Sequence, residues 1–502
     1  MRKPFITLSA ISLLSLPAIS KDKPNIILFL VDDMGWEDTS VPFWSKATEL
    51  NKIYETPNME RLASKGMKFT NAYACPVSSP SRVSLITGSN VTRHKVSNWT
   101  LYKDKSTDGA NKYFDFGKWN YNGVQPVDGI NQSFYSKPFP AILQENGYYT
   151  MIFGKAHFGA LDTPAADPLT MGFDLNIGGH AAGAMGSYLG EENYGNRDNS
   201  EHSKVWGVPD LEEYHGSNVF LTEALTQKAL KSMDKALEND KPFFLYMSHY
   251  AVHAPFAKDD RFYKKYREKG LSDREAQYAG LVEGMDKSLG DIMDYLEQKG
   301  IDDNTVVIFM SDNGGYTVGR VDKNYPLRGG KGSVFEGGIR EPMIVSWPGI
   351  AKEHTICSTP IIIEDFFPTI LEMAGAKYSK LPQKVDGKSF VGQLKGRRGD
   401  LNRPLYFHYP NDWGERFNNV GEPQSAVIIG DYKLIHFYET KTNLLYNIKE
   451  DISETNDLSK NPKYTKTLQK LAKSLSDRLR ETKANMPIQK DGKLALYPDQ
   501  TF

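Results

Sequence analysis

Four short apolar segments, each followed at once by polar side chains, constrain the fold of this chain more than any other feature. They are residues 25–31, 148–153, 242–247 and 305–310. Short, almost wholly apolar runs are typical of parallel strands that are buried on both faces. Helical patterns lie between them, the clearest from Tyr278 to Leu296. Strands that alternate with helices predict crossover connections and a mostly parallel sheet with both faces covered.

The polar residues at the ends of these segments predict a single site. The carboxyl ends of parallel strands share one edge of the sheet, where open α/β sheets bind their ligands. Turn residues commonly end strands, which explains one such case but hardly four together. The residues delivered there are Asp32, Asp33, Lys155, His157, His249, His253, Asp312 and Asn313. We expect them to meet at one site, except His249, which we interpret as a satisfied core histidine.

The candidate residues divide into two chemical classes. One class offers only oxygen and amide groups: Asp32, Asp33, Asp312 and Asn313. Three carboxylates brought together repel unless a cation lies between them, and oxygen ligands suit Ca²⁺ or Mg²⁺ better than Zn²⁺. The other class is cationic or titratable near neutral pH: Lys155, His157, His253 and Lys331. A divalent cation beside such groups predicts a site for an oxyanion, with the histidines transferring protons.

A serine-rich segment, residues 75–88, contains a candidate nucleophile. Pro80 is tolerated in the first turn of a helix, so Ser78 and Ser79 are expected at a helix N-terminus. Backbone N–H groups and the helix dipole favour a bound anion at that point, and Arg82 on the first turn would face it. A serine hydroxyl attacks poorly without activation, for which metal coordination or covalent conversion would serve.

This segment resembles the signature of the type I, formylglycine-dependent sulfatases of the alkaline-phosphatase superfamily. Their motif is Cys or Ser, any residue, Pro, Ser and Arg, followed by Thr-Gly, and residues 78–82 with 87–88 satisfy it. Cys75 does not, because Val77 stands where the motif would need proline. Ser78, in place of cysteine, indicates the serine-type class, and Ala156 replaces a usual Trp. Further matching segments are residues 31–36, 154–159, 172–174, 253–255, 311–315, 327–331 and 336–340.

The resemblance implies a fold and an activity. The fold is α/β, with a large mixed, mostly parallel sheet sandwiched by helices and a small C-terminal α+β domain. The activity is that of a sulfuric ester hydrolase, a sulfatase. A sulfatase-maturating enzyme would convert Ser78 to formylglycine (3-oxoalanine), whose hydrate would attack sulfur while bound to a divalent metal, Ca²⁺ rather than Mg²⁺. The implied metal ligands are Asp32, Asp33, Ser78, Asp312 and Asn313.

The resemblance also implies roles for the remaining catalytic residues. Arg82 would stabilise the nucleophilic oxyanion, and Lys155 and Lys331 would bind the sulfate oxygens, whose charge grows in the transition state. His157 would assist collapse of the sulfated hemiacetal. His253 would protonate the leaving oxygen, which matters because a sugar alkoxide is a poor leaving group.

Two long loops are expected to select the substrate. Residues 93–135 are polar and aromatic-rich, residues 178–197 are glycine-rich, and loops of such length are usually functional or disordered. Trp and Tyr beside Arg and His would suit an anionic sugar, so we expect a sulfated polysaccharide or glycosaminoglycan fragment. The candidate contacts are His94, Trp99, His180 and Arg328. A formal net charge of −1 gives no sign of a nucleic-acid binder.

The two ends of the chain differ from its middle in their pattern of apolar and polar residues. Residues 1–20 combine a basic start, a short apolar run and small residues near Ser20, which predicts an export signal and a periplasmic or secreted protein without a stable membrane anchor. Residues 21–385 are the expected catalytic domain. Short strands and a leucine-lined helix predict the small domain over residues 386–502. Cys75 and Cys357 are too few for a disulfide scaffold, and their pairing stays open.

Two other functions remain open from the sequence. A phosphodiesterase or phosphonate hydrolase of the same superfamily would share the fold and the metal cluster. A non-catalytic glycan-binding relative would result if Ser78 stays unmodified, although a pure binder has no need of a proton donor such as His253.

Overall fold

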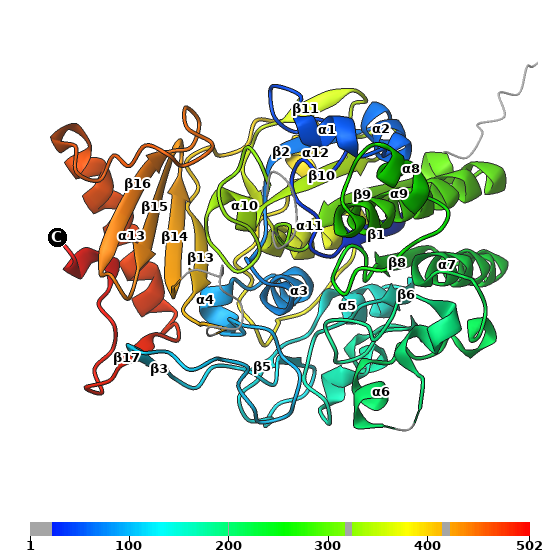
Figure 1. Ribbon diagram of the computed structural model, residues 1–502, viewed down its shortest axis with the longest axis horizontal. Coiled ribbons are helices and arrows are strands. Elements are labelled where there is room, and N and C mark those ends of the chain that lie inside the picture. Colours follow the sequence, from blue (N-terminus) through cyan, green and yellow to red (C-terminus); the bar gives the residue numbers. More distant parts are fainter. Residues whose placement is uncertain (1–22, 199, 317–323, 414–421) are drawn as a thin grey trace, which may run out of the picture.

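A large mixed sheet lies at the centre of the computed structural model, which describes residues 23–198, 200–316, 324–413 and 422–502 (Figure 1). The predicted export signal lies outside these ranges. Within them, the strand order is β11-β2-β10-β9-β1-β8-β6-β7, and β12 also pairs with β2. The strands are β1 (Asn25–Val31), β2 (Met67–Tyr73), β6 (Tyr149–Gly154), β7 (Leu175–Ile177), β8 (Phe243–Ser248), β9 (Thr305–Ser311), β10 (Arg340–Ser346), β11 (Thr355–Cys357) and β12 (Ile361–Ile362).

The four predicted strands are adjacent in the middle of this sheet, in the order β9-β1-β8-β6, and all are parallel. Ile27 of β1 lies opposite Leu245 of β8 and Val307 of β9. β10 runs antiparallel to both of its neighbours, which makes the sheet mixed. The predicted fold class is therefore confirmed.

Helices cover both faces of the sheet because both faces of its strands are apolar. Ile27 and Phe29 of β1 pack with α2 (Pro57–Ser64), α7 (Leu221–Glu238) and α9 (Asp273–Lys299). Ile26 and Leu28, which point the other way, pack with α3 (Ser78–Thr87), α5 (Phe139–Glu145) and α11 (Phe366–Met373). This alternation follows from the two-residue period of a strand. The shorter helices are α1 (Glu49–Ile53), α4 (Val91–His94), α6 (Glu201–Trp206), α8 (Tyr263–Glu268), α10 (Glu336–Ile339) and α12 (Val391–Leu394).

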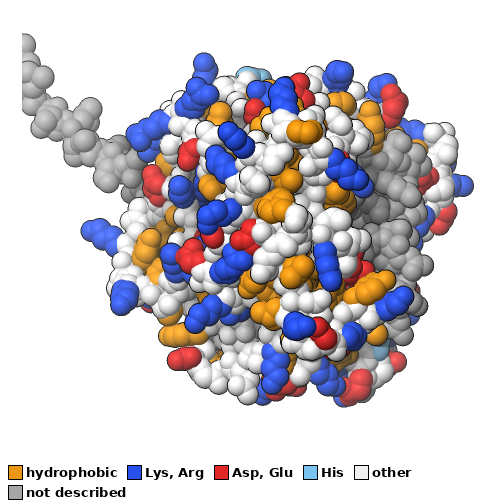
Figure 2. All heavy atoms as spheres, turned by 90° about the vertical axis from the view of Figure 1, so that its left-hand side faces the viewer, with side chains coloured by type: hydrophobic (Ala, Val, Ile, Leu, Met, Phe, Trp, Pro, Cys, Tyr) orange, Lys and Arg blue, Asp and Glu red, His pale blue; other side chains and the backbone are white. Residues whose placement is uncertain are grey.

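The C-terminal part forms a second, antiparallel sheet beside the first. Its strands are β13 (Leu405–Tyr409), β14 (Gln424–Ile429), β15 (Tyr432–Phe437) and β16 (Thr442–Asn447), paired in chain order. The helix α13 (Thr465–Glu481) covers one face with Leu468, Leu471, Leu475 and Leu479. Figure 2 shows this side of the molecule, where Lys and Arg side chains are scattered among acidic and uncharged ones. The short strands outside both sheets are β3 (Phe114–Phe116), β4 (Val124–Gln125), β5 (Phe134–Tyr135) and β17 (Pro487–Gln489).

A buried ionic cluster joins the two sheets. Lys433 of β15 contacts Glu336 at the start of α10 and Glu454, each at 2.9 Å, and the three side chains are fully buried. Buried charges are tolerated only when they are paired. The pairing therefore fixes the loop before α10, which carries Lys331, against the C-terminal sheet.

The sequence leaves the pairing of the two cysteines open, and the structure decides it. Cys75 and Cys357 are both free thiols, so they do not pair. Across the described ranges, every helix is either too short or too polar to cross a lipid bilayer.

Candidate active site

Six charged side chains form a buried cluster at the carboxyl edge of the main sheet. They pair one to one: Arg82 with Asp312 at 2.9 Å, Lys155 with Asp32 at 2.7 Å, and Lys331 with Asp33 at 2.7 Å. The strand ends bring the acids and Lys155 together, as predicted, and α3 and the loop before α10 add the other two cations. Because each carboxylate has a cation beside it, the cluster is tolerated away from water.

The oxygen atoms of this cluster fit a divalent cation. Asp32, Asp33 and Asp312 each offer one carboxylate oxygen, and these three atoms lie within 4.8 Å of one another. The Nδ2 of Asn313 donates to Asp33 at 2.8 Å, which leaves its Oδ1 as a further oxygen ligand. Burial opposes ionisation of Asp33, but Lys331 and His253 outweigh it and lower the pKa of this carboxyl. Ionised carboxylates with an amide oxygen are a donor set that hard divalent cations prefer.

Ser78 is the first residue of α3 and lies directly against this donor set. Its Oγ is 3.2 Å from Oδ1 of Asp32 and 3.0 Å from Oδ1 of Asn313. Arg82, one turn later, is fully buried and donates to Asp312, to the carbonyl of Lys155 and to Ser248. The predicted helix start therefore places residue 78 beside both the carboxylates and the cations.

Lys155 and Lys331 differ in how far the nearby carboxylates offset the effect of burial on the pKa. Burial lowers the pKa of Lys155 to about 8, although Asp32 partly opposes the shift. Burial also acts on Lys331, but there Asp33 and Asp32 outweigh it and raise the pKa. Both ammonium groups remain positive at neutral pH, so both can bind an oxyanion.

Two histidines complete the cluster. Burial and the nearby Lys155 lower the pKa of His157 well below its ordinary value. The Nε2 of His157 lies 2.9 Å from the carbonyl of Thr100 and 2.9 Å from Oγ of Ser79. Because a carbonyl only accepts, Nε2 carries the hydrogen and Nδ1 is the basic nitrogen.

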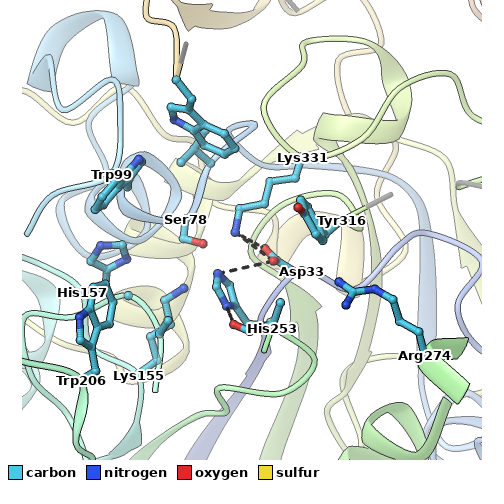
Figure 3. Close-up of a pocket in the computed structure, with 15 residues that line it drawn as sticks. Asp33, Ser78, Trp99, Lys155, His157, Trp206, His253, Arg274, Tyr316 and Lys331 are labelled. Atoms are coloured by element: carbon cyan, nitrogen blue, oxygen red, sulfur yellow. Dashed lines mark hydrogen bonds and ion pairs between the residues drawn. The ribbon is translucent and has the colours of Figure 1, made fainter. Parts of the chain in front are cut away.

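His253 lies on the other side of Ser78. Its Nε2 is 3.7 Å from Oδ2 of Asp33, and its Nδ1 contacts the carbonyl of Ala254 (Figure 3). Burial and Lys331 lower its pKa. His249 is fully buried against Ser288, which agrees with its interpretation as a core histidine.

A cavity of ≈ 320 Å³ opens above the cluster (Figure 3). Aromatic side chains from four separate segments line it, namely Trp99, Trp206, Tyr316 and Trp413. The indole of Trp413 donates to Asn98, the neighbour of Trp99, at 2.6 Å, so the two tryptophans are positioned together. Arg274, in the first turn of α9, also lines the cavity.

Only one of the four predicted substrate contacts lines this cavity, and it is Trp99. His94 is fully buried: its Nε2 bonds Ser84 at 2.9 Å and its Nδ1 accepts from the amide of Val96. It is therefore a packing residue behind α3, and its predicted role as a substrate contact is wrong.

Arg328 and His180 also lie outside the residues that line the cavity. The guanidinium of Arg328 stacks on Phe335 at 4.1 Å and donates to the carbonyl of Glu454, toward the C-terminal sheet. The ring of His180 faces Tyr250, and its carbonyl accepts from the amide of His157. Neither residue is therefore a lining residue of this cavity.

Four lining residues escaped the sequence reasoning: Trp206, Arg274, Tyr316 and Trp413. None directly follows one of the four predicted strands of the main sheet, and none belongs to a segment that matches a family motif. The only available signal was residue type, a tryptophan or an arginine in a polar segment, and the chain holds many such positions.

Comparison with known protein families gives matches over most of the chain. A family model described as "Sulfatase" matches residues 24–376, and a second, "N-sulphoglucosamine sulphohydrolase, C-terminal", matches residues 330–482. The first match contains every residue of the buried cluster. The second spans the loop of Lys331, the C-terminal sheet and α13.

Individual proteins show the same similarity. A "Sulfatase" from Formosa agariphila is 31% identical over 497 residues, covering 88% of this chain and 86% of that protein. The N-acetylgalactosamine-6-sulfatase of Mus musculus is 31% identical over 439 residues, covering 85% of this chain and 74% of that protein. The crystal structure of Ps i-CgsB in complex with k-i-k-neocarrahexaose has a TM-score of 0.72 and 28% identity, covering 92% of this chain and 94% of that one.

Proposed function

The chain belongs to the sulfatase family and is a sulfuric ester hydrolase, and from this premise we propose that it removes O-sulfate from a carbohydrate, a polysaccharide or glycosaminoglycan fragment. One observation carries the proposal. Residue 78 lies among three carboxylate–cation pairs at the base of a cavity whose walls are aromatic. The base suits an anion, and aromatic walls suit the apolar faces of sugar rings. Two similar proteins, an N-acetylgalactosamine-6-sulfatase and Ps i-CgsB in complex with k-i-k-neocarrahexaose, support a sugar substrate as well.

The proposal includes two groups that would complete the site. Ser78 would be converted to formylglycine by a maturating enzyme, and Ca²⁺ would be held by Asp32, Asp33, Asp312, Asn313 and residue 78. Together these groups would supply an activated hydroxyl nucleophile and a means of releasing the sulfate afterwards. The fit rests on the oxygen donors within 4.8 Å of one another and on the contact of Ser78 with two of the ligands.

The side chains around residue 78 would hold the substrate and move protons. Lys155 and Lys331 flank the site from opposite sides and would bind the sulfate oxygens as their charge grows (Figure 3). Arg82, fully buried, would hold Asp312 in place. His253, at the mouth of the cluster and 21% exposed, would give a proton to the leaving ester oxygen. His157 would take a proton at Nδ1 when sulfate is released, since its Nε2 already donates to Thr100.

Mass spectrometry tests the nucleophile. Trypsin releases residues 69–82 as one peptide, because Lys68 and Arg82 bound it. In protein from its native host, we expect this peptide to have lost two hydrogens at Ser78. An intact serine in fully active enzyme would overturn the proposed nucleophile. The Ser78→Ala variant serves as control and should have no activity.

Assays on paired substrates test the reaction. We expect release of sulfate from sulfated oligosaccharides, and little release of phosphate from matched phosphate or phosphonate esters. Faster phosphoryl turnover would favour the phosphodiesterase alternative. Tight glycan binding without turnover by protein from its native host, with Ser78 intact, would favour the glycan-binding alternative.

We also propose that the protein is exported, with cleavage near Ser20. The basic, then apolar, then small-residue order of residues 1–20 supports this. N-terminal sequencing of the protein recovered from the periplasm or medium tests it, and a full-length chain in the cytoplasm would contradict it.

A further inference from the structure

We propose that Arg274 binds a second anionic group of the substrate, so that the enzyme prefers sugars that carry a carboxylate or another sulfate near the ester that is cleaved. This inference rests on the proposed function, since it concerns the same cavity. It adds a specificity-determining residue that does not belong to the buried cluster.

The charges of the site point to Arg274. At the base, three cations are matched by three carboxylates: Arg82 by Asp312, Lys155 by Asp32 and Lys331 by Asp33. These six side chains surround residue 78 and would be occupied with one sulfate and the groups that activate the nucleophile. Arg274 belongs to none of the three pairs. It is a cationic side chain that lines the cavity and lies outside that cluster.

The position of Arg274 is fixed by its helix. It lies in the first turn of α9, whose start is closed by a capping box between Ser272 and Glu275. Its guanidinium carbon lies 4.6 Å above the ring of Phe256, which supports the side chain from below. An arginine on a 27-residue helix, stacked on a ring, is held more firmly than one on a loop. Such preorganisation reduces the entropy lost when it binds a ligand.

The opposite wall of the cavity has a different chemistry. In Figure 3, the guanidinium of Arg274 points into the cavity toward Tyr316 and Asp33, whereas Trp99 and Trp206 lie on the opposite side of Ser78, next to His157. A sugar seated over residue 78 would therefore have indole rings on one side and a guanidinium on the other. Rings accept the apolar face of the sugar, and a guanidinium binds carboxylate or sulfate through two parallel hydrogen bonds.

The size of the cavity limits where the second anion can be. At ≈ 320 Å³ it lies at the small end of the range for small-molecule sites, roughly 300–1,000 Å³. The anion should therefore be on the sugar whose ester is cleaved or on the adjacent sugar. A distant charge along a polymer would lie outside the reach of Arg274.

Steady-state kinetics on three matched substrates tests the inference. The substrates share one sulfated sugar and differ in a second substituent: a neutral hydroxyl, a carboxylate, or another sulfate. The measured quantity is the preference, the ratio of kcat/KM for each dianionic substrate to that for the neutral one. Hydrogen bonds to charged groups contribute about 1.5–3 kcal/mol, which corresponds to a preference of roughly 10- to 100-fold.

We expect Arg274→Ala to lower this preference roughly 10- to 100-fold, mainly through KM, and Arg274→Lys to restore part of it. Lys264→Ala is the control, because Lys264 is 87% exposed on α8 and does not line the cavity. A loss for only one of the two dianions identifies the carboxylate or the sulfate as the group that is recognised. Equal losses on all three substrates, or an unchanged preference, would overturn the inference while leaving the proposed function intact. No sulfate release from any substrate by the wild type would overturn both.

Discussion

Gly183 leaves the space that the ring of His157 occupies, and replacing it with alanine should displace that ring. A Cβ at residue 183 would lie 2.2 Å from Cε1, 2.5 Å from Nδ1 and 2.7 Å from Nε2 of His157. Carbon atoms in ordinary contact are about 3.5–4.0 Å apart, so the ring must move by about 1 Å or more. It would then lose its 2.9 Å contacts with Thr100 and Ser79.

A misplacement of 1 Å in a catalytic group can lower the rate by about 100-fold. We therefore expect Gly183→Ala to reduce kcat by about two orders of magnitude on a sulfated oligosaccharide. KM should change little, because Lys155 and Lys331, which would bind the sulfate, are not touched. Overpacking should also lower the free energy of unfolding by about 1–3 kcal/mol.

Gly280→Ala is the matched control, because an added Cβ there meets its nearest heavy atoms at 3.9 Å, in the interior of α9. We expect wild-type kcat and equal or slightly higher stability, since alanine is the better helix former. Thermal unfolding followed by circular dichroism establishes that both variants are folded at the assay temperature. A folded Gly183→Ala protein with wild-type kcat would refute either the catalytic role of His157 or the steric argument.

Three further predictions test the buried charges. Lys433→Met should lower the free energy of unfolding by about 3–5 kcal/mol, because Glu336 and Glu454 lose their shared cation; a Tm within one or two degrees of wild type would contradict this. Burial raises the pKa of Glu364 to about 7 from 4.5, so its contribution to the free energy of unfolding is fully present below about pH 4.5 and is lost as pH rises through 7. In urea titrations, the free energy of unfolding should decline less over that pH window for Glu364→Gln than for the wild type. Parallel pH dependences in the two proteins would count against the shift. A chelator should lower Tm and Ca²⁺ should restore it, because Ca²⁺ at a concentration of 100 Kd raises the free energy of unfolding by about 2.7 kcal/mol. In Asp33→Asn the response of Tm to Ca²⁺ should be smaller. An equal response in both proteins would place the ion elsewhere.

The sequence alone was sufficient to predict which side chains meet at the base of the site. Asp32, Lys155 and Asp312 each follow a buried strand directly or within two residues. Parallel strands bring their carboxyl ends to one edge whatever the loops do, so these groups had to meet once the strands were identified. Ser78 was equally accessible, because a proline two residues into an apolar helical pattern marks where a helix begins. In all these cases a short sequence pattern is enough to determine where the side chain lies in the fold.

The walls of the cavity were decided by the tertiary structure. Trp206, Arg274 and Trp413 come from segments far apart in the chain, and they meet because helices and the C-terminal sheet pack beside the edge of the main sheet. His94 carried the same kind of signal as Trp99, five residues away, yet it faces the core while Trp99 faces the cavity. The direction of a side chain on a loop or a short helix depends on what packs against it, and that information is spread over residues distant in sequence. Strand ends are positioned by backbone topology, whereas substrate contacts are positioned by packing.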